Sequence, residues 1–181
     1  MIEDIFMRHL TFLLAAGLTM AGCTTTSERP VAAGAPQPNA SLHGVLRDAN
    51  GAERGRVSLR PRGHMLDVKV RAYGLTPGAH GMHLHAVGSC IAPGFTSAAG
   101  HWNPDNKQHG HANPMGAHRG DLPQLMVSAN GKGTAYFQLM AHAADLRDAD
   151  GTALVIHAGA DDERSDPAGN SGPRQLCAEL R

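Results

Sequence analysis

Histidine is concentrated in one part of this sequence. The chain has 181 residues and 12 histidines, and seven of these histidines lie between His80 and His118. An even distribution would place about three histidines there. Imidazole nitrogens are common ligands for zinc and copper, and they also take part in proton transfer. We therefore expect the chemistry of the protein, and metal binding in particular, in this segment.

Two of these histidines have the spacing of a β-strand pair. His83 and His85 flank Leu84, and alternate residues of a strand point to the same side. Both imidazoles would then project together while Leu84 faces the core. Such a pair alone is equally compatible with ordinary surface or core histidines. Five further candidate ligands follow in the chain: His101, His109, His118, Asp121 and His157.

These seven side chains are sufficient for two metal ions. Four imidazoles in a tetragonal arrangement suit copper, whereas three imidazoles and one carboxylate in a tetrahedron suit zinc. The other histidines are expected to be solvated or to form ordinary hydrogen bonds: His43, His64, His80, His111 and His142. Among them, His111 is the exception, because it lies two residues from the candidate ligand His109.

The elements that position these ligands have the period of β-strands. Beyond residue 40, apolar and polar side chains alternate, most clearly in residues 66–72. Turn-forming residues at 48–51 and 130–131 each separate two strand-like runs, which predicts two hairpins. A further apolar run at 153–156 leads directly into His157. The pattern predicts an all-β protein, an antiparallel β-sandwich or barrel of short strands.

Two long segments interrupt the predicted strands. Residues 86–122 and 158–174 are rich in Gly, Pro, Asn and Asp. Loops of this length are usually functional or disordered, and the histidine content favours a functional role. Residues 140–148 are less clear, because they could form a short helical turn or an irregular connection.

Several segments resemble the copper, zinc superoxide dismutases that bacteria export. The similar segments are GMHLHAVGSC, FTSAAGHWNP, GDLP, LVIHAGADD and GNSGPRQLC, together with the spacing from His101 to His109 and His118. The resemblance covers about residues 42–181. It implies a Greek-key β-sandwich or barrel of about eight strands with two long functional loops.

The resemblance also implies an activity and a role for each site residue. The protein would be an oxidoreductase that converts superoxide to O2 and H2O2 with copper cycling between Cu(II) and Cu(I). The copper ligands would be His83, His85, His101 and His157. The zinc ligands would be His101, His109, His118 and Asp121, so that His101 bridges the two metals and carries a proton to the departing peroxide. Asp161 would hydrogen-bond one ligand of each metal, and Arg174 would attract the anionic substrate.

The N-terminal residues predict export and lipid attachment. Residues 10–20 are apolar but too few to cross a bilayer, which is typical of a signal peptide. Met7 opens a more typical signal than Met1 does. Residues 20–23 resemble a bacterial lipobox ending in Cys23, and the alternative is an ordinary signal with an incidental cysteine. We expect a signal peptide at 1–22, a lipidated Cys23 with a flexible tether at 23–40, and the folded domain at 41–181. Thr24 favours a periplasmic location at the outer membrane.

Cysteine usage agrees with export. Of three cysteines, Cys23 is assigned to lipid, which leaves Cys90 and Cys177 as a pair in an oxidising compartment. We therefore predict a disulfide bond between them. The alternative is two buried free thiols.

Composition excludes some partners and leaves other questions open. Sixteen basic residues balance 16 acidic residues, so net charge attracts the chain neither to nucleic acid nor to an anionic membrane. A membrane would be reached only through the lipid anchor. A copper carrier is one alternative, but it needs neither Arg174 nor a complete zinc set. A surface interaction module with purely structural metals is another, and closed coordination would be expected there. The sequence does not decide between a monomer and a homodimer.

Overall fold

Alternating side chains form the strands at the centre of this fold. The structure is a computed structural model that describes residues 39–181. In β3 (Met65–Tyr73), every second residue from Leu66 to Ala72 is buried. The antiparallel neighbours of β3 are β2 (Glu53–Arg62) and β7 (Lys132–Leu139). The apolar face of these three strands lines one side of the core, and their polar face is turned to solvent.

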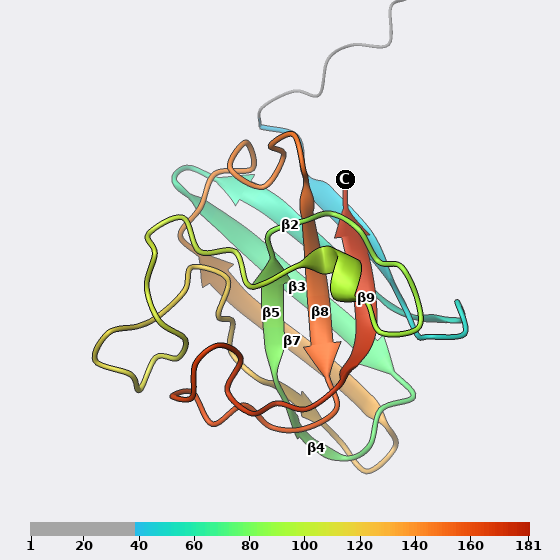
Figure 1. The fold of residues 1–181 in the computed structure, drawn as a ribbon. Helices are drawn as coiled ribbons and strands as arrows, with labels where there is room; N and C mark the ends of the chain where they lie inside the picture. The colour runs from blue at the N-terminus through green and yellow to red at the C-terminus, as the bar shows by residue number, and fades with distance from the viewer. Residues whose placement is uncertain (1–38) are drawn as a thin grey trace, which may run out of the picture. The chain divides into compact units, whose positions relative to one another are not determined.

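The nine strands form one antiparallel sheet that curls into a nearly closed barrel (Figure 1). Their order is β4-β6-β7-β3-β2-β1-β9-β8-β5. The remaining strands are β1 (Leu42–Arg47), β4 (Gly78–His80), β5 (Met82–His85), β6 (Leu125–Val127), β8 (Thr152–His157) and β9 (Arg174–Leu180). The two edge strands, β4 and β5, are separated in the chain only by Gly81. Counted as one interrupted strand, they give the eight strands that the resemblance implied.

Gly81 is required where β4 passes into β5. Its carbonyl accepts a hydrogen bond from His157 N at 2.8 Å, and its N–H donates to Gly159 O at 2.8 Å. A Cβ at this position would lie 2.6 Å from Ser171 Oγ, which is shorter than a van der Waals contact, so a side chain here would clash with Ser171. The absence of a side chain therefore lets β5 lie against the loop that follows β8.

The two long loops are packed against the barrel. Every residue of β5 and β8 is buried, because the loops cover the outside of these strands. Phe95 and Ala98 from the first loop form a small apolar cluster with Ala153 and Val155 of β8. The predicted disulfide between Cys90 and Cys177 is present and ties this loop to β9.

Most of the expected elements are confirmed. The hairpin across residues 48–51 joins β1 to β2, and that across 130–131 joins β6 to β7, although β6 pairs mainly with β4. Residues 140–148 form an irregular connection of turns. The only helical element between residues 39 and 181 is the 3-10 turn Thr96–Ala98. No helix in the described chain has the length and hydrophobicity needed to cross a membrane. The predicted signal peptide, Cys23 and residues 24–38 lie outside the described residues.

Candidate metal centre

The first long loop places its ligands by running beside β5. Trp102 N donates to Leu84 O at 2.8 Å, and Leu84 N donates to Gly120 O at 2.9 Å. Isolated antiparallel bridges also pair His85 with His101 and His83 with Asp121. The loop therefore supplies backbone partners to β5 from both of its arms. This arrangement brings the predicted loop ligands next to the two strand histidines.

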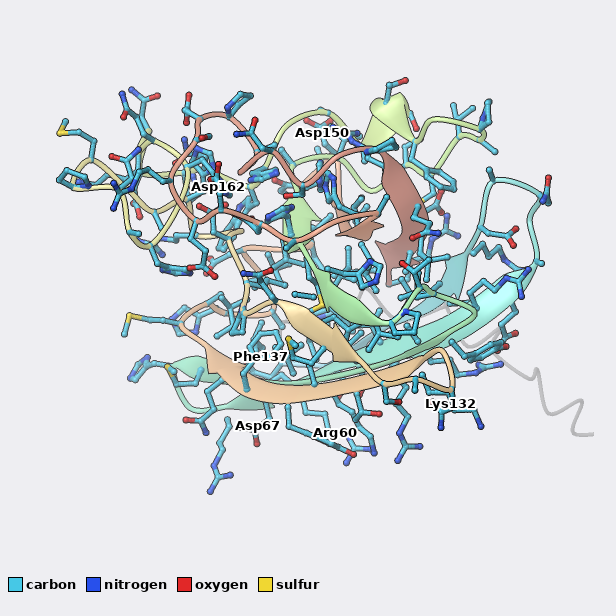
Figure 2. The ribbon with its side chains drawn as sticks, turned by 90° about the horizontal axis from the view of Figure 1, so that it is seen from below. Arg60, Asp67, Lys132, Phe137, Asp150 and Asp162 are labelled. Carbon is cyan, nitrogen blue, oxygen red and sulfur yellow. A yellow bond between two sulfur atoms is a disulfide. The ribbon has the colours of Figure 1, made fainter. Side chains whose placement is uncertain are left out.

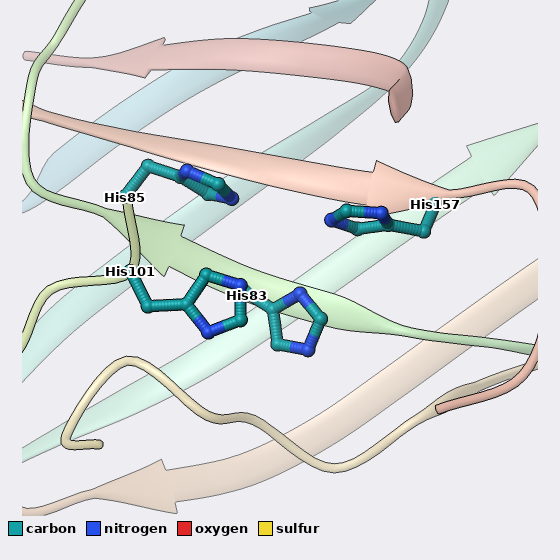
Figure 3. A group of neighbouring side chains, drawn as sticks. All are labelled: His83, His85, His101 and His157. Atoms are coloured by element: carbon teal, nitrogen blue, oxygen red, sulfur yellow. The ribbon is translucent and has the colours of Figure 1, made fainter. Parts of the chain in front are cut away.

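Four imidazoles form a first cluster in which each ring has one nitrogen without a partner (Figure 3). His83 Nε2 donates to Asp161 Oδ2 at 2.6 Å, His85 Nδ1 to Ala99 O at 2.9 Å, and His157 Nδ1 to Gly172 O at 2.8 Å. The nitrogens without partners are His83 Nδ1, His85 Nε2, His101 Nε2 and His157 Nε2. One nitrogen from each of the four rings lies within 4.8 Å of the others. The proton of each bonded ring is held away from this centre, so the free nitrogen offers a lone pair.

Burial keeps these rings neutral. It lowers the pKa of His83 to about 4 and that of His85 to about 2. Burial also lowers the pKa of His101 and of His157. Neutral imidazole is the form that binds a metal ion, so at pH 7 no proton has to be removed before a cation enters.

A second cluster surrounds one carboxylate oxygen. Asp121 Oδ1 lies 2.9 Å from His101 Nδ1, 3.1 Å from His109 Nδ1 and 3.2 Å from His118 Nδ1. The other oxygen, Oδ2, accepts backbone hydrogen bonds from Gly110 and His118 at 2.8 and 3.0 Å. Three imidazole nitrogens and one carboxylate oxygen thus converge on one point, which is the donor set of a tetrahedral zinc site.

Judged only by the distances between ligand atoms, the fourth member of the second cluster would be His83 and not His118. His83 lies near His101, His109 and Asp121 by ligand-atom distance. However, its Nε2 is occupied by Asp161, and its Nδ1 is one of the free nitrogens of the first cluster. His118 is the better fourth member because its Nδ1 faces both Asp121 and His101 Nδ1, the latter at 3.3 Å. His101 contributes one nitrogen to each cluster.

Asp161 connects the two clusters. Its Oδ2 accepts from His83 Nε2 at 2.6 Å, and its Oδ1 accepts from His109 Nε2 at 3.0 Å. The backbone of Asp161 is held in turn by the amide of Gln124, with Nε2 to Asp161 O at 2.9 Å and Asp161 N to Oε1 at 3.0 Å. A Cβ on Gly169 would collide with the Asp161 carboxyl group. One carboxylate therefore orients a ring in each cluster.

The second cluster attracts positive charge. Burial disfavours the charged form of His109, but hydrogen bonds with Asp121 and Asp161 outweigh it and raise the pKa of His109 to about 10. Burial opposes ionisation of both carboxyl groups too, yet their imidazole partners lower the pKa of Asp121 and of Asp161. Without a metal, the positive charge beside the two carboxylates is supplied by a proton on His109, and a divalent cation would displace that proton.

Arg174 lies at the start of β9, beside the first cluster. Its Nη1 donates to Phe95 O and its Nη2 to Ala99 O, both at 2.6 Å. It does not pair with Asp166, whose carboxylate accepts from His109 N at 2.6 Å. Arg174 lines an open groove of about 570 Å³ together with Thr96, His85, His101 and His157. The groove thus connects solvent to the cluster of four imidazoles.

The other histidines have the hydrogen-bonding and solvated roles expected of them. His80 is buried, with Nδ1 at 2.7 Å from His157 O and Nε2 at 2.8 Å from Thr76 O, so it supports the end of β8. His111 is exposed and its Nε2 contacts the backbone carbonyl of Asp121 at 3.1 Å. Sequence reasoning did not identify Gln124 or Asp166. No local signal marks them, because each acts on a residue 37 or 57 positions away.

Comparison with known families gives one consistent match. The family model described as copper/zinc superoxide dismutase matches residues 53–180. "Superoxide dismutase [Cu-Zn] 2" of Aquifex aeolicus is 38% identical over 148 residues, which are 77% of this chain and 85% of that protein. The "Superoxide dismutase-like protein YojM" of Bacillus subtilis is 44% identical over 126 residues. That match covers 64% of this chain and 62% of the length of YojM.

Solved structures agree in fold. A superoxide dismutase-like protein from Bacillus subtilis has a TM-score of 0.73 and 38% identity, and the match covers 77% of this chain and 97% of that chain. The Cu/Zn superoxide dismutase from Brucella abortus has a TM-score of 0.61 and 31% identity, covering 78% of this chain and all of that chain. Two further structures of the Bacillus protein are variants in which histidine was introduced by substitution. The present chain has its own histidine at all six histidine positions of the two clusters.

Proposed function

We propose how the residues of this chain carry out the chemistry of the copper/zinc superoxide dismutase family, to which the chain belongs. The protein is an oxidoreductase that dismutates superoxide to O2 and H2O2 with copper and zinc. The assignment of single residues to this chemistry is our proposal. The observation that carries it is the set of four buried imidazole nitrogens without partners, which face one another beside the three nitrogens around Asp121.

The donor atoms fit the two metals. Copper would be held by the first cluster, through the free nitrogens of His83, His85, His101 and His157. Zinc would be held by the second cluster, through His101, His109, His118 and Asp121. His101 would bridge them, because its two nitrogens face different clusters. When bound, copper supplies one-electron transfer in both directions, whereas zinc has no redox chemistry.

The chain's own residues orient the ligands and handle protons. Asp161 and the carbonyls of Ala99 and Gly172 accept the N–H of three rings and so fix which nitrogen remains free. His101 lines the groove, and its buried Nε2 has no protein partner. When it is not a ligand it is placed to hold a proton and to pass it to the reduced product.

Arg174 binds and orients the substrate. A guanidinium group has five N–H donors, and two of them are used by the carbonyls of Phe95 and Ala99. The remaining donors can bind a small anion in the groove. Ala99 O also accepts from His85 Nδ1, so one carbonyl fixes the guanidinium relative to the proposed copper site.

The decisive experiment measures metal content and turnover in one preparation. We expect about one copper and one zinc per chain by mass spectrometry of the metals, and fast superoxide decay by pulse radiolysis. Zinc-loaded protein without copper should be inactive until copper is added. Copper bound without zinc and without turnover would instead indicate a copper carrier, and both metals bound without turnover would indicate purely structural sites.

We also propose that the chain is exported and lipid-anchored. Support comes from the apolar residues 10–20 and the Gly22-Cys23 sequence. In this proposal residues 1–22 are removed, Cys23 is lipidated, residues 23–40 tether the domain at 41–181, and the protein resides in the periplasm at the outer membrane. Changing Cys23 to Ser should move the protein from the membrane fraction to the soluble fraction. Continued membrane association of the variant would contradict lipidation. A homodimer stays an untested prediction.

A further inference from the structure

The outer face of the sheet carries a cluster of basic side chains far in sequence from the metal ligands. Arg60 and Lys132 project from the solvent side of the sheet, and Phe137 points to the opposite side, into the core (Figure 2). Asp150 and Asp162 lie on the loop side of the molecule in the same view. The whole chain has no net charge. Asp67 projects beside Arg60 in the same view, so any excess of positive charge on this face depends on which of its cations are paired with carboxylates.

Strand register brings like charges together on this face. Arg56 of β2 lies directly opposite Arg71 of β3, and Ser58 lies opposite Lys69. Directly opposite residues have Cβ atoms about 5 Å apart, and like charges there destabilise the sheet. The three cations Arg56, Lys69 and Arg71 thus share a small area of the outer face. A positive pair that costs stability points to an anion that the surface binds.

Protein carboxylates neutralise only part of this charge. Arg56 pairs with Glu53 at 2.9 Å, and Arg181 pairs with Glu179. Among residues 39–181, no carboxylate lies within 4.0 Å of the charged groups of Arg60, Lys69 or Arg71. Asp67 faces Arg60 across the strands, but it is bound by Arg62 and Gln138. Three adjacent cations therefore remain without an acidic partner in the described chain.

These side chains surround an open groove of about 570 Å³ over β1, β2, β3 and the end of β9. Glu179 is the only Asp or Glu in its lining, and Arg181 also carries the α-carboxylate of the last residue. Five basic side chains line the groove: Arg56, Arg60, Lys69, Arg71 and Arg181. None of the groove residues belongs to the two loops that carry metal ligands and Arg174. The groove is thus a separate concave surface with a net positive charge.

Two cations of the groove, Lys69 and Arg71, act on a tyrosine beside it. The ammonium group of Lys69 lies 5.1 Å from the ring centroid of Tyr136 on β7. Side-chain hydrogen bonds from Lys69 and then from Arg71 lower the pKa of the exposed Tyr136 hydroxyl, and the charges of the two cations add a smaller effect in the same direction. Both cations therefore favour negative charge beside the groove, as an anionic ligand would supply.

We propose that this groove is a binding site for phosphate-bearing anions. A planar guanidinium group matches the oxygens of a phosphate in a bidentate manner, and charge-assisted bonds of this type are strong. Three unpaired cations and a length that spans three strands suit a ligand with two phosphate groups. The phosphates could belong to a soluble phosphate ester or to the headgroups of an anionic membrane, and the two sources are separable by experiment.

The first arm tests a soluble bisphosphate. Fructose 1,6-bisphosphate is titrated calorimetrically into the copper- and zinc-loaded chain at low ionic strength. The double substitution Lys69→Gln with Arg71→Gln should weaken binding at least about tenfold, since it removes two charge-assisted contacts. The matched control, Lys107→Gln with Arg164→Gln, removes one exposed lysine and one exposed arginine on the loop side, outside the groove, and should bind like the parent. Arg174 is intact in both variants, so binding that survives the groove substitution belongs to the active site and overturns the proposal.

The second arm tests a membrane surface. The chain carrying Cys23→Ser, which has no acyl group, is sedimented with vesicles of phosphatidylcholine alone or with phosphatidylglycerol added. Binding only to the phosphatidylglycerol vesicles, lost in the groove variant and kept in the control variant, identifies lipid headgroups as the source. Binding of the bisphosphate without the vesicles identifies a soluble ester.

Folding is controlled in both arms. Removal of Arg71 relieves its repulsion with Arg56, so the thermal midpoint of the groove variant should not fall below that of the parent. If it does fall, the single exposed substitution Arg60→Gln replaces the double one. Failure of the parent to bind either probe, or equal weakening in the groove and control variants, would refute the proposal.

Discussion

Replacing Asp161 with Asn should separate the two metals. The carboxylate accepts N–H groups from His83 at 2.6 Å and His109 at 3.0 Å, and its Oδ1 also accepts from Glu163 N at 2.6 Å. An amide of the same shape has only one accepting oxygen, and its nitrogen must donate. The ring that faces this nitrogen has to move its proton from Nε2 to Nδ1. Nδ1 is the atom that each of these rings offers to its cluster.

The expected loss follows from this change of tautomer. Substitution of an outer hydrogen-bond partner weakens a metal site by about tenfold to a hundredfold. Because an amide cannot serve both rings, one metal should be lost while the other is kept, and the ratio of copper to zinc should depart from one. The ratio is measured on the purified variant after dialysis against a weak chelator. Nitrogen-15 NMR of the zinc-loaded protein identifies the ring whose proton has moved.

A neighbouring substitution provides the control. Asp162→Asn makes the same chemical change one residue along, at an exposed carboxylate that bonds to Arg164 N, Ser165 N and Asn170. It should leave both metals bound at a ratio near one. If Asp161→Asn also retains both metals with the affinities of the parent, the reasoning about shared protons is wrong.

Three other predictions follow from the same geometry. Arg174→Ala should lower kcat/KM about tenfold or more without loss of metal, and kcat/KM should then fall less steeply with added salt. Pulse radiolysis at several ionic strengths measures both effects, and a variant with the parent's kcat/KM and salt dependence would exclude a role for Arg174. His101→Ala should abolish the magnetic coupling seen by electron paramagnetic resonance when Cu(II) fills both sites, and a coupled spectrum in the variant would remove His101 as the bridge. Finally, metal-free protein should be most stable near pH 6.5, the ordinary pKa of histidine. Below that pH, His83 and His85 bind protons in the unfolded chain but stay neutral when buried, so acid favours unfolding. Above it, His109 keeps its proton in the folded chain only, and this stabilisation is lost as pH rises towards about 10. Urea unfolding across pH 4–10 tests this maximum, and a stability that rises steadily through this range would contradict it.

The strands and ligand candidates were predictable from local sequence. Alternation in residues 66–72 depends only on neighbouring residues, and it sets the buried face of β3 directly. Likewise, the spacing of His83 and His85 within a strand determines that they project together. The apolar run at 153–156 also became a strand, β8, which is one residue longer at each end than predicted.

Contacts made by backbone atoms and by distant residues were not predictable in this way. Residue types do not reveal that the carbonyls of Ala99 and Gly172 select the free nitrogens of two rings. The hold of Gln124 on Asp161 spans 37 residues. The basic groove depends on register, because a shift of β2 against β3 by one residue would turn Arg56 away from Arg71. Such features arise only once the sheet has assembled.

The pairing of the first long loop with β5 has a consequence for solubility. An edge strand with unpaired backbone groups is a template for association with other chains. Here the edge is covered by residues that include His101 and Asp121, which bridge to His85 and His83. The proposed metal ligands in this loop therefore also cover β5, so that its edge cannot pair with a strand of another copy of the chain. We therefore expect loss of the metals to loosen this cover and to raise the tendency of the chain to aggregate.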